Sequence, residues 1–295
     1  MNKIILKNLG LKGEKLQATY LPDDGMNLIS YKMNEIEVID QSTMNLFLER
    51  RAGLGALIGP HFYHRKIIPT NIDPALFPHM KERSKQGITE PFSHGIGRYV
   101  PWKYVNSETQ IKAELHGKDL YKGVPLSVFE GQDFAMTYSA KLIPTGLVIE
   151  YMIRSENPSV IGLHYYYCIR GKSSIIGHVG DSYRDQNEWK SIPKSWRGKR
   201  ADQLSFDLNQ EADFGFIPKK KDPCDHNYQF LLSTGDYSLH VDFHAASETD
   251  VCCQIYHPKE SSFVCIEPIS ARYPPLPELT SSILEVKLEI FDPIQ

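Results

Sequence analysis

Apolar and polar residues alternate along much of this chain. In residues 284–290 (LEVKLEI) every second side chain is apolar and the others are charged, and residues 238–243 (SLHVDF) alternate in the same way. Because successive side chains of a strand point to opposite faces of a sheet, this period of two is typical of a strand with one buried face. Similar runs predict strands at residues 35–39, 134–138, 175–179 and 251–256.

A turn sequence joins two further runs of this kind. Residues 140–143 (AKLI) and 147–153 (LVIEYMI) are separated by Pro144, Thr145 and Gly146. Proline and glycine adopt the dihedral angles that a tight turn requires, so this segment predicts a β-hairpin.

Helical periodicity is scarce in the chain. Residues 43–51 fit about two helical turns, with Ser42 or Thr43 as the N-cap. The 19 prolines and 20 glycines are spread along the sequence, and no linker marks a domain boundary. Many short strands in one continuous chain therefore predict an all-β fold, a large antiparallel β-sandwich that spans residues 1–295 as a single domain.

Residues 181–223 show neither periodicity. They contain Trp189, Trp196 and two basic runs, RGKR and KKK. An irregular segment of this length is uncommon in a compact domain and is often functional. The sequence leaves two alternatives open, a loop that covers a site and a solvated surface excursion.

Charge and hydropathy argue against several classes of protein. The formal net charge of −3 gives no reason to expect nucleic acid or an anionic membrane as a partner. The first residues hold only a short apolar run, and no later stretch approaches the length of a transmembrane helix. A cytoplasmic protein is expected.

The five cysteines do not form a disulfide framework. Their number is odd, and Cys252 and Cys253 are adjacent rather than spaced as a pair of metal ligands. Reduced and mostly buried thiols are expected. A zinc site built from His61, His64, His79 and a cysteine fits no common ligand spacing.

Four separated segments carry candidate chemistry. They are FSHGIGRYVPW with His94, VIGLHYYY with His164, CDHNY with Asp225 and FVCIEP with Glu267. Each places an acid-base or hydrogen-bonding group beside aromatic residues or beside glycine and proline. A carboxylate next to an apolar run, such as Glu267, is costly to bury unless it is paired, so it either faces water or has a chemical task.

The order of these segments resembles the aldose 1-epimerase (galactose mutarotase-like) family. In that family a glycine-rich segment leading to an arginine precedes an HG motif and a PW pair, and an asparagine, a histidine beside aromatic residues, an aspartate and a Glu-Pro pair follow. The resemblance extends over roughly residues 17–291. The matching positions are residues 53–60 with Arg65, His94-Gly95, Pro101-Trp102, Asn157, His164 in GLHYYY, Asp225 and Glu267-Pro268.

Two positions depart from the family pattern. The sequence after His164 reads HYYY where HPYF is usual, so the proline is lost and the aromatic residues remain. His64 precedes Arg65 where the family commonly has asparagine. The second departure weakens the match of Arg65 more than that of the histidine and the glutamate.

The resemblance implies both the fold and the chemistry. It implies a galactose mutarotase-like β-sandwich with few short helices, and an isomerase that interconverts the α and β anomers of a hexose by ring opening, without a cofactor or a metal. By similarity, Glu267 is the general base and His164 the general acid. The sugar-binding residues are then His94, Asp225 and Arg65.

Arg98 leaves the class of substrate open. It ends HGIGR, which is similar to the HGFAR-type motif of mutarotase-like proteins that act on hexose 6-phosphates. A guanidinium binds phosphate through paired charge-assisted hydrogen bonds. The expected substrate is a monosaccharide first and a sugar phosphate second. A carbohydrate-binding or sensing protein without turnover, and a different carbohydrate-active enzyme, remain alternatives.

Two further expectations concern the neighbours and the protonation of the site. Tyr165 and Trp102 are expected to pack in the core, with stacking on a sugar as the alternative. Activity is expected to follow a bell in pH. Its alkaline limb should lie near or above neutrality, because an ionised Glu267 would favour the charged imidazole of His164.

Overall fold

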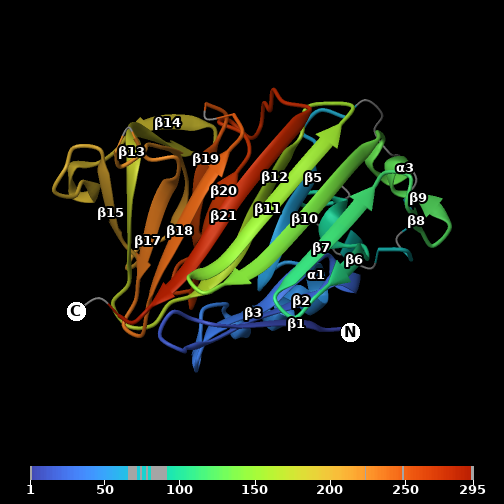
Figure 1. The fold of residues 1–295 in the computed structure, drawn as a ribbon. Helices are drawn as coiled ribbons and strands as arrows, with labels where there is room; N and C mark the ends of the chain where they lie inside the picture. Colours follow the sequence, from blue (N-terminus) through green and yellow to red (C-terminus); the bar gives the residue numbers. More distant parts are fainter. Residues whose placement is uncertain are drawn as a thin grey trace.

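Most of the molecule is one strongly curved β-sheet (Figure 1). The structure is a computed structural model and describes residues 2–65, 72–73, 75–77, 79–80, 92–222, 224–247 and 249–293. Within these residues the sheet has 19 strands, and the neighbouring strands pair antiparallel. The predicted all-β antiparallel sandwich with few short helices is confirmed.

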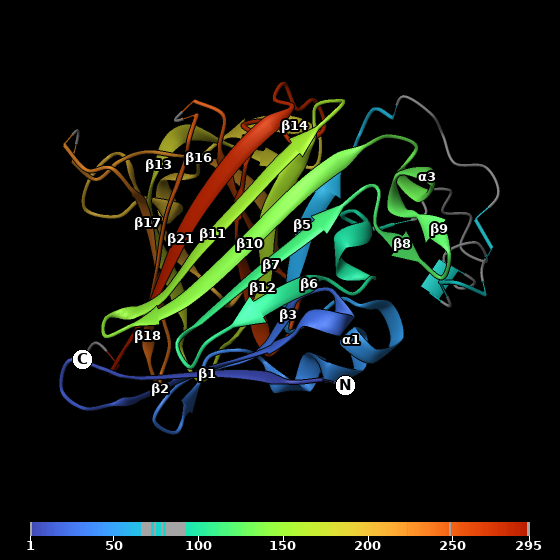
Figure 2. The same ribbon diagram turned by 45° about the vertical axis from the view of Figure 1, so that its right-hand side comes forward.

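The sheet curves so that one half lies over the other (Figure 2). The front half of Figure 1 consists, in order of pairing, of β6 (Lys103–Asn106), β7 (Gln110–His116), β10 (Phe134–Ile143), β11 (Gly146–Ser155), β21 (Ser281–Phe291), β18 (Ser238–Ala245) and β17 (Tyr228–Ser233). The half behind and below it consists of β16 (Ala212–Pro218), β19 (Cys252–His257), β20 (Phe263–Ile269), β12 (Val160–Cys168), β5 (Gly55–His61), β3 (Asn27–Met33), β2 (Lys15–Leu21) and β1 (Ile4–Leu9).

One long strand, β13 (Ser174–Asp185), joins the two halves. Its residues 174–177 pair with β17, and its residues 179–185 pair with β16. The short strands β15 (Gln203–Asp207) and β14 (Glu188–Ser191) pair with its two ends. The sheet therefore passes from the front to the back without a break.

Short elements complete the fold. They are β4 (Ile36–Glu37), the hairpin of β8 (Leu120–Tyr121) and β9 (Val124–Pro125), the helices α1 (Met44–Arg50) and α3 (Leu126–Glu130), and the 3-10 turns η1 (Pro22–Asp24), η2 (Gln41–Thr43), η3 (Ile96–Arg98) and η4 (Lys194–Trp196). Among the described residues, no helix has the length and apolar character needed to cross a membrane.

The core lies between the two halves of the sheet and is rich in tyrosine. Tyr138 on β10 and Tyr165 on β12 are almost completely buried, as is Tyr20 on β2. The Tyr138 hydroxyl lies 3.2 Å from the Tyr20 hydroxyl and 2.9 Å from that of Tyr165. Because a buried hydroxyl without a partner costs about 1 to 3 kcal/mol, this chain of hydroxyl groups lets large aromatic side chains fill the core.

Most strands predicted from the alternation are present. Residues 284–290, 238–243 and 147–153 lie inside β21, β18 and β11. Ile143 pairs with Gly146 across the predicted hairpin turn. In these strands the alternation reports which face of the sheet is buried.

Two local predictions are confirmed only in part. The strand predicted at residues 35–39 is reduced to β4, which has two residues. The predicted helix is α1, with Thr43 at the N-cap position. The Thr43 hydroxyl donates to the carbonyl of Asp40 and does not cap the helix.

The prediction of an irregular segment at residues 181–223 is wrong. The segment contains the end of β13, then β14, η4, β15 and β16. These three complete strands are four, five and seven residues long, and all four residues of β14 are exposed. The exposed residues of β14 do not alternate, and β15 and β16 are short, so pairing with β13 and β19 determines their structure.

Residues 92–98 lie against β5 through a glycine. The Gly59 amide donates to the His94 carbonyl at 2.7 Å. His94 (φ 60°) and Gly95 (φ 89°) both have left-handed backbone, and a Cβ on Gly95 would lie 2.1 Å from the carbonyl oxygen of Pro60. Only glycine permits this approach, which holds His94 against β5.

Gly95→Ala should lower the free energy of unfolding by about 3 kcal/mol or more, because it adds a steric clash to the strain of a positive φ. Gly123→Ala is the matched control, since Gly123 has a φ of +85° and no atom within 4 Å of the added Cβ. That variant should lose only about 1 to 2 kcal/mol. Urea denaturation measures both. Equal losses would show that the approach to Pro60 does not constrain the backbone.

Candidate active site

His164 and Glu267 lie on the face of the sheet opposite the core. On β12, Leu163 and Tyr165 are buried in the core, and the alternate residues His164 and Tyr166 line a cavity on the other face. Glu267 on β20 lines the same cavity. The alternation of strand side chains thus separates the core from the site within one sheet.

Glu267 and His164 face each other on adjacent strands. β12 and β20 are antiparallel with Tyr166 opposite Cys265, so the register brings residue 164 opposite residue 267. His164 Nε2 lies 3.3 Å from Glu267 Oε1, and the two residues are 8% and 3% exposed. Strand pairing, without a flexible loop, therefore sets the distance within this acid-base pair.

Aromatic rings surround the imidazole. The ring of Tyr166 stacks on His164 with centroids 5.0 Å apart and planes at 14°. The ring of His94 meets it edge-on at 5.2 Å, and Tyr256 does so at 6.1 Å. These contacts restrict rotation of the imidazole while its Nε2 lies beside the carboxyl group.

The acid-base pair opens onto a cavity of about 400 Å³. Pockets that bind small ligands have volumes of roughly 300 to 1,000 Å³. The polar side chains that line this cavity around the pair include those of His61, His94, Arg98, Arg184, Asp213 and Gln254. A small polar ligand in this cavity could therefore be surrounded by groups that donate or accept hydrogen bonds.

Arg98 is a buried cation beside the pair. It is 3% exposed, and its Nε and Nη2 donate to the carbonyl oxygen of Leu57 at 2.9 and 2.6 Å. Its charge lowers the pKa of His164 and opposes the rise in the pKa of Glu267. Arg98 is thus tied to β5 by its guanidinium and acts on both members of the pair electrostatically.

Three side chains from three strands form a hydrogen-bonded network at the edge of the cavity. Arg184 Nη2 on β13 donates to Gln254 Oε1 on β19 at 2.7 Å. Gln254 Nε2 donates to Asp213 Oδ1 on β16 at 2.6 Å. The network fixes a cation, an amide and a carboxylate next to Glu267.

Burial dominates the titration of the acid-base pair. Desolvation, with the charge of Arg98, lowers the pKa of His164 from 6.5 to about 3. Desolvation and the negative charge of Asp213 raise the pKa of Glu267 well above 4.5. Between these values the pair holds one proton and has no net charge. Loss of hydration thus outweighs the mutual attraction that led us to expect an ionised Glu267 beside a charged imidazole.

The structure brings together four of the six sequence-predicted site residues. His94, Arg98, His164 and Glu267 all line the cavity. Asp225 does not: it is exposed in a turn before β17, where its Oδ2 accepts the Asp222 amide at 3.0 Å.

Arg65 is also absent from the lining residues. Its Nη2 lies 3.0 Å from Glu130 Oε2, and the side chains are 10% and 0% exposed. The other carboxylate oxygen of Glu130 accepts the Ile96 amide at 2.7 Å. Glu130 thus joins both Arg65 and the start of η3, which carries Arg98, to the end of α3.

Sequence reasoning missed Asp213, Arg184 and Gln254. Asp213 and Arg184 lie in the segment interpreted as irregular, so no face could be assigned to them. The run ADFGFIP in β16 did contain a signal, because its two phenylalanines alternate with Asp213, Gly215 and Ile217. Gln254 follows two adjacent cysteines on β19, and nothing in its local sequence indicates a functional residue.

The expected core positions of Tyr165 and Trp102 are confirmed. Tyr165 is fully buried and shares a hydrogen bond with Tyr138. Trp102 is 3% exposed, and its indole N–H donates to the Gly97 carbonyl at 2.8 Å. Neither side chain lines the cavity, whereas Tyr166 does.

A metal ion bound by the described residues would have to use the acid-base pair itself. Over the described parts of the chain, the group with suitable spacing is His164, Cys265 and Glu267, whose ligand atoms lie within 4.8 Å of one another. The zinc ligands considered from the sequence, His61, His64 and His79, do not form such a group among these residues. An ion bound there would occupy the two atoms that face each other at 3.3 Å.

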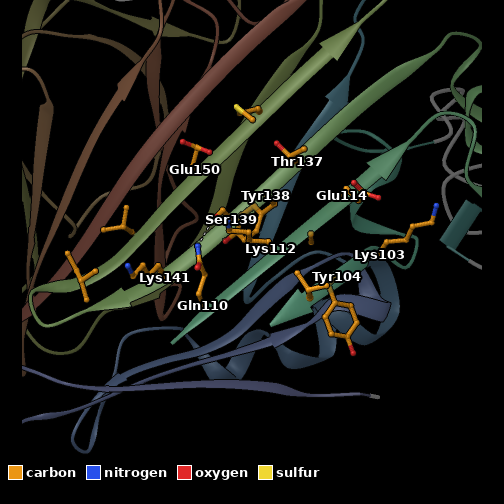
Figure 3. A pocket seen from close by; sticks show the side chains of 15 residues that line it. Lys103, Tyr104, Gln110, Lys112, Glu114, Thr137, Tyr138, Ser139, Lys141 and Glu150 are labelled. Atoms are coloured by element: carbon orange, nitrogen blue, oxygen red, sulfur yellow. Dashed lines mark hydrogen bonds between the residues drawn. The ribbon is translucent and has the colours of Figure 1, made fainter. Parts of the chain in front are cut away.

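A larger cavity, of about 810 Å³, lies on the outer face of the front half of the sheet. Figure 3 shows its lining, in which Lys112, Thr137, Lys141 and Glu150 project from β7, β10 and β11. None of the described residues that line it is a histidine or a cysteine. The smaller cavity is the candidate active site, because it alone of these two brings an acid and a base into contact.

Solved structures share this fold over nearly the whole chain. A galactose mutarotase-like protein from Lactobacillus casei is 13% identical with a TM-score of 0.66, and the match covers 98% of this chain and 100% of that one. The GalM/aldose epimerase homologue from C. elegans is 14% identical with a TM-score of 0.65 and coverage of 99% and 100%. A galactose mutarotase-like protein from Clostridium acetobutylicum is 13% identical, with a TM-score of 0.61 and coverage of 98% of each chain.

No protein-family model and no curated protein matches the sequence. The chain has the galactose mutarotase-like fold, and the resemblance suggested by the order of its motifs is confirmed at the level of the fold.

Proposed function

We propose that this protein is an aldose 1-epimerase, an isomerase that interconverts the α and β anomers of a hexose. The observation that carries the proposal is the 3.3 Å contact between His164 Nε2 and Glu267 Oε1 in a cavity of about 400 Å³. The galactose mutarotase-like fold supports it.

Anomer exchange needs one proton removed and one delivered. The base takes the proton of the anomeric hydroxyl while the acid protonates the ring oxygen, so the ring opens to the aldehyde. The carbonyl carbon then rotates, and the ring closes from the other face with both proton transfers reversed. Glu267 is the base and His164 the acid.

A single proton on the pair suffices for both steps. The raised pKa of Glu267 and the lowered pKa of His164 place the resting proton on the carboxyl group. Transfer across the 3.3 Å contact gives a carboxylate and an imidazolium with the same total charge. Ring opening consumes this charge-separated form and returns the pair to its resting form, and ring closure does the reverse.

Four other lining residues are suited to hold the sugar. His94, Arg98, Arg184 and Asp213 surround the pair, and their side chains donate to or accept from hydroxyl groups. We leave Arg65 and Asp225 out of the proposed site. The ion pair of Arg65 with Glu130 and the exposed turn of Asp225 favour structural roles for both.

A hexose 6-phosphate is the second candidate substrate. It is favoured by the two arginines that line the cavity, Arg98 and Arg184. The guanidinium of Arg98 already donates twice to the Leu57 carbonyl, and that of Arg184 donates to Gln254 and to the carbonyl of Gln186. Because these bonds engage both groups, a free aldose is the first candidate.

Glu267→Gln and His164→Gln should each lower the rate of anomer exchange by about 100-fold or more, because each removes one of the two proton carriers. The double variant should lose much less than the product of the single effects, since the pair acts as a unit. Exchange spectroscopy by NMR on α-glucose and α-galactose measures the rates.

Glu150→Gln is the control for these variants, because Glu150 is an exposed carboxylate of the larger cavity on the other half of the sheet. It should leave the rate unchanged. Near-parental exchange by Glu267→Gln would remove Glu267 as the base. A parent protein that binds hexoses but exchanges them no faster than buffer would favour the alternative of a carbohydrate-binding or sensing protein.

The dependence of kcat/KM on pH should show a broad plateau. The active pair holds one proton, so activity falls at low pH when the pair gains a second proton and at high pH when it loses the first. Burial lowers the pKa of His164, which puts the acid limb below 6.5, and raises that of Glu267, which puts the alkaline limb above 4.5. An acid limb centred near 6.5 would mean that His164 titrates as an exposed imidazole.

Arg98→Lys should reduce kcat/KM for glucose and for glucose 6-phosphate by the same factor. Lysine keeps the positive charge near the pair but cannot reproduce the two hydrogen bonds from Nε and Nη2 to Leu57. Parallel assays of both sugars measure the two factors. A loss about 30-fold greater for the phosphate, the scale of one broken charged contact of about 2 kcal/mol, would instead assign Arg98 to phosphate binding and favour the sugar phosphate.

A further inference from the structure

A third cavity lies beside the candidate active site. It has a volume of about 370 Å³, and its lining includes Trp189, Asp250, Tyr273 and Leu276. Trp189 and Leu276 are 45% and 58% exposed. Large apolar side chains that are exposed together in a cavity are typical of a binding surface.

Strand pairing places Trp189 in one transverse row with the acid-base pair. Trp189 pairs with Arg184, and Arg184 pairs with Gly215. Gly215 pairs in turn with Gln254, and Gln254 pairs with Glu267. Directly paired residues of antiparallel strands point to the same face. Four steps between strands, at about 4.8 Å each, separate Trp189 from Glu267 by about 19 Å along the sheet.

No side chain projects from the middle of this row, because residue 215 is a glycine. A Cβ at this position would lie 2.9 Å from Arg184 Nη2 and 3.0 Å from Gln254 Oε1. The guanidinium crosses over the glycine to donate to Gln254 at 2.7 Å. The planar guanidinium and amide groups therefore form a polar floor between Glu267 and Trp189.

The cavity beside Trp189 also offers a hydrogen-bond acceptor. Asp250 Oδ1 accepts the Arg272 amide at 2.8 Å. The other oxygen, Oδ2, is buried and has no hydrogen-bond partner among the described residues. An exposed indole can stack on the apolar face of a sugar ring, and a carboxylate oxygen can accept from one of its hydroxyls.

We propose that the cavity beside Trp189 is a distal sugar subsite, and that the substrate is a reducing oligosaccharide of three rings. The first ring lies at Glu267 and His164, the second over the floor of Arg184 and Gln254, and the third against Trp189. A ring spans roughly 5 Å on covalent bond lengths, so a single hexose cannot bridge the separation of about 19 Å between the backbones of Glu267 and Trp189. Three linked rings span about 15 Å, and the length of the Trp189 side chain can cover the remaining distance of about 4 Å. This inference rests on the proposed function, since it places the reducing end at the acid-base pair.

Anomer exchange at the reducing end of glucose, maltotriose and cellotriose tests the subsite. Trp189→Ala should lower kcat/KM for at least one of the trisaccharides about tenfold, the size expected for a lost aromatic stacking contact of about 1.4 kcal/mol. The same variant should leave glucose unchanged. Trp189→Phe keeps an aromatic ring and should restore most of the loss.

Phe291→Ala is the matched control. Phe291 is an aromatic residue at the end of β21 with 42% exposure, and it lines neither cavity. This variant should behave as the parent on all three sugars. An equal effect of Trp189→Ala on glucose and the trisaccharides, or no effect on any of them, would overturn the subsite while leaving the anomer exchange intact.

Saturation-transfer NMR separates the subsite from the catalytic proposal. In the parent, saturation should reach the protons of the non-reducing ring of a trisaccharide, and Trp189→Ala should abolish that transfer. If this holds but no sugar is exchanged, the subsite stands and the epimerase function fails. If neither transfer to the non-reducing ring nor exchange is seen in the parent, both are overturned.

Discussion

The antiparallel register of β12 and β20 holds a carboxyl group and an imidazole 3.3 Å apart with almost no access to water. Removing an ionisable group from water is costly, and it is tolerated when the group is neutral or paired. The single shared proton makes the pair neutral as a whole. Charge separation is then available within one contact, at the wall of the cavity.

The charges around the pair work against each other. Burial and the charge of Asp213 raise the pKa of Glu267, and the charges of Arg98 and Arg184 oppose that rise. Each of these three groups is itself held by hydrogen bonds to the backbone or to Gln254. The site therefore contains fixed dipoles and ions that need little rearrangement when charge moves between Glu267 and His164.

One face of the sheet forms the core, and the opposite face carries the candidate catalytic residues. Odd-numbered residues of β12, such as Tyr165, complete the core between the two halves, and His164 and Tyr166 face the cavity. A substitution on the cavity face can thus change the chemistry without opening the core. The approach of Gly95 to Pro60 links backbone packing to the site, because it holds the segment that carries His94 and Arg98 at the cavity.

The sequence by itself determined the strands whose alternation is strong, the turn between β10 and β11, and the chemical character of Glu267, His164, His94 and Arg98. Each of these depends on local order, which a linear chain displays directly. Because residues 181–223 were not recognised as strands, no face could be assigned to Asp213 on β16 or to Arg184 near the end of β13, and Asp225, predicted as a binding residue, lies in an exposed turn before β17 and not in the cavity. Only the tertiary structure decided which strands became neighbours, since pairing depends on contacts between distant segments and the side chains that meet across them. For the same reason, the row from Glu267 through Gly215 to Trp189, made of five strands from three separate parts of the chain, exists only in the folded sheet.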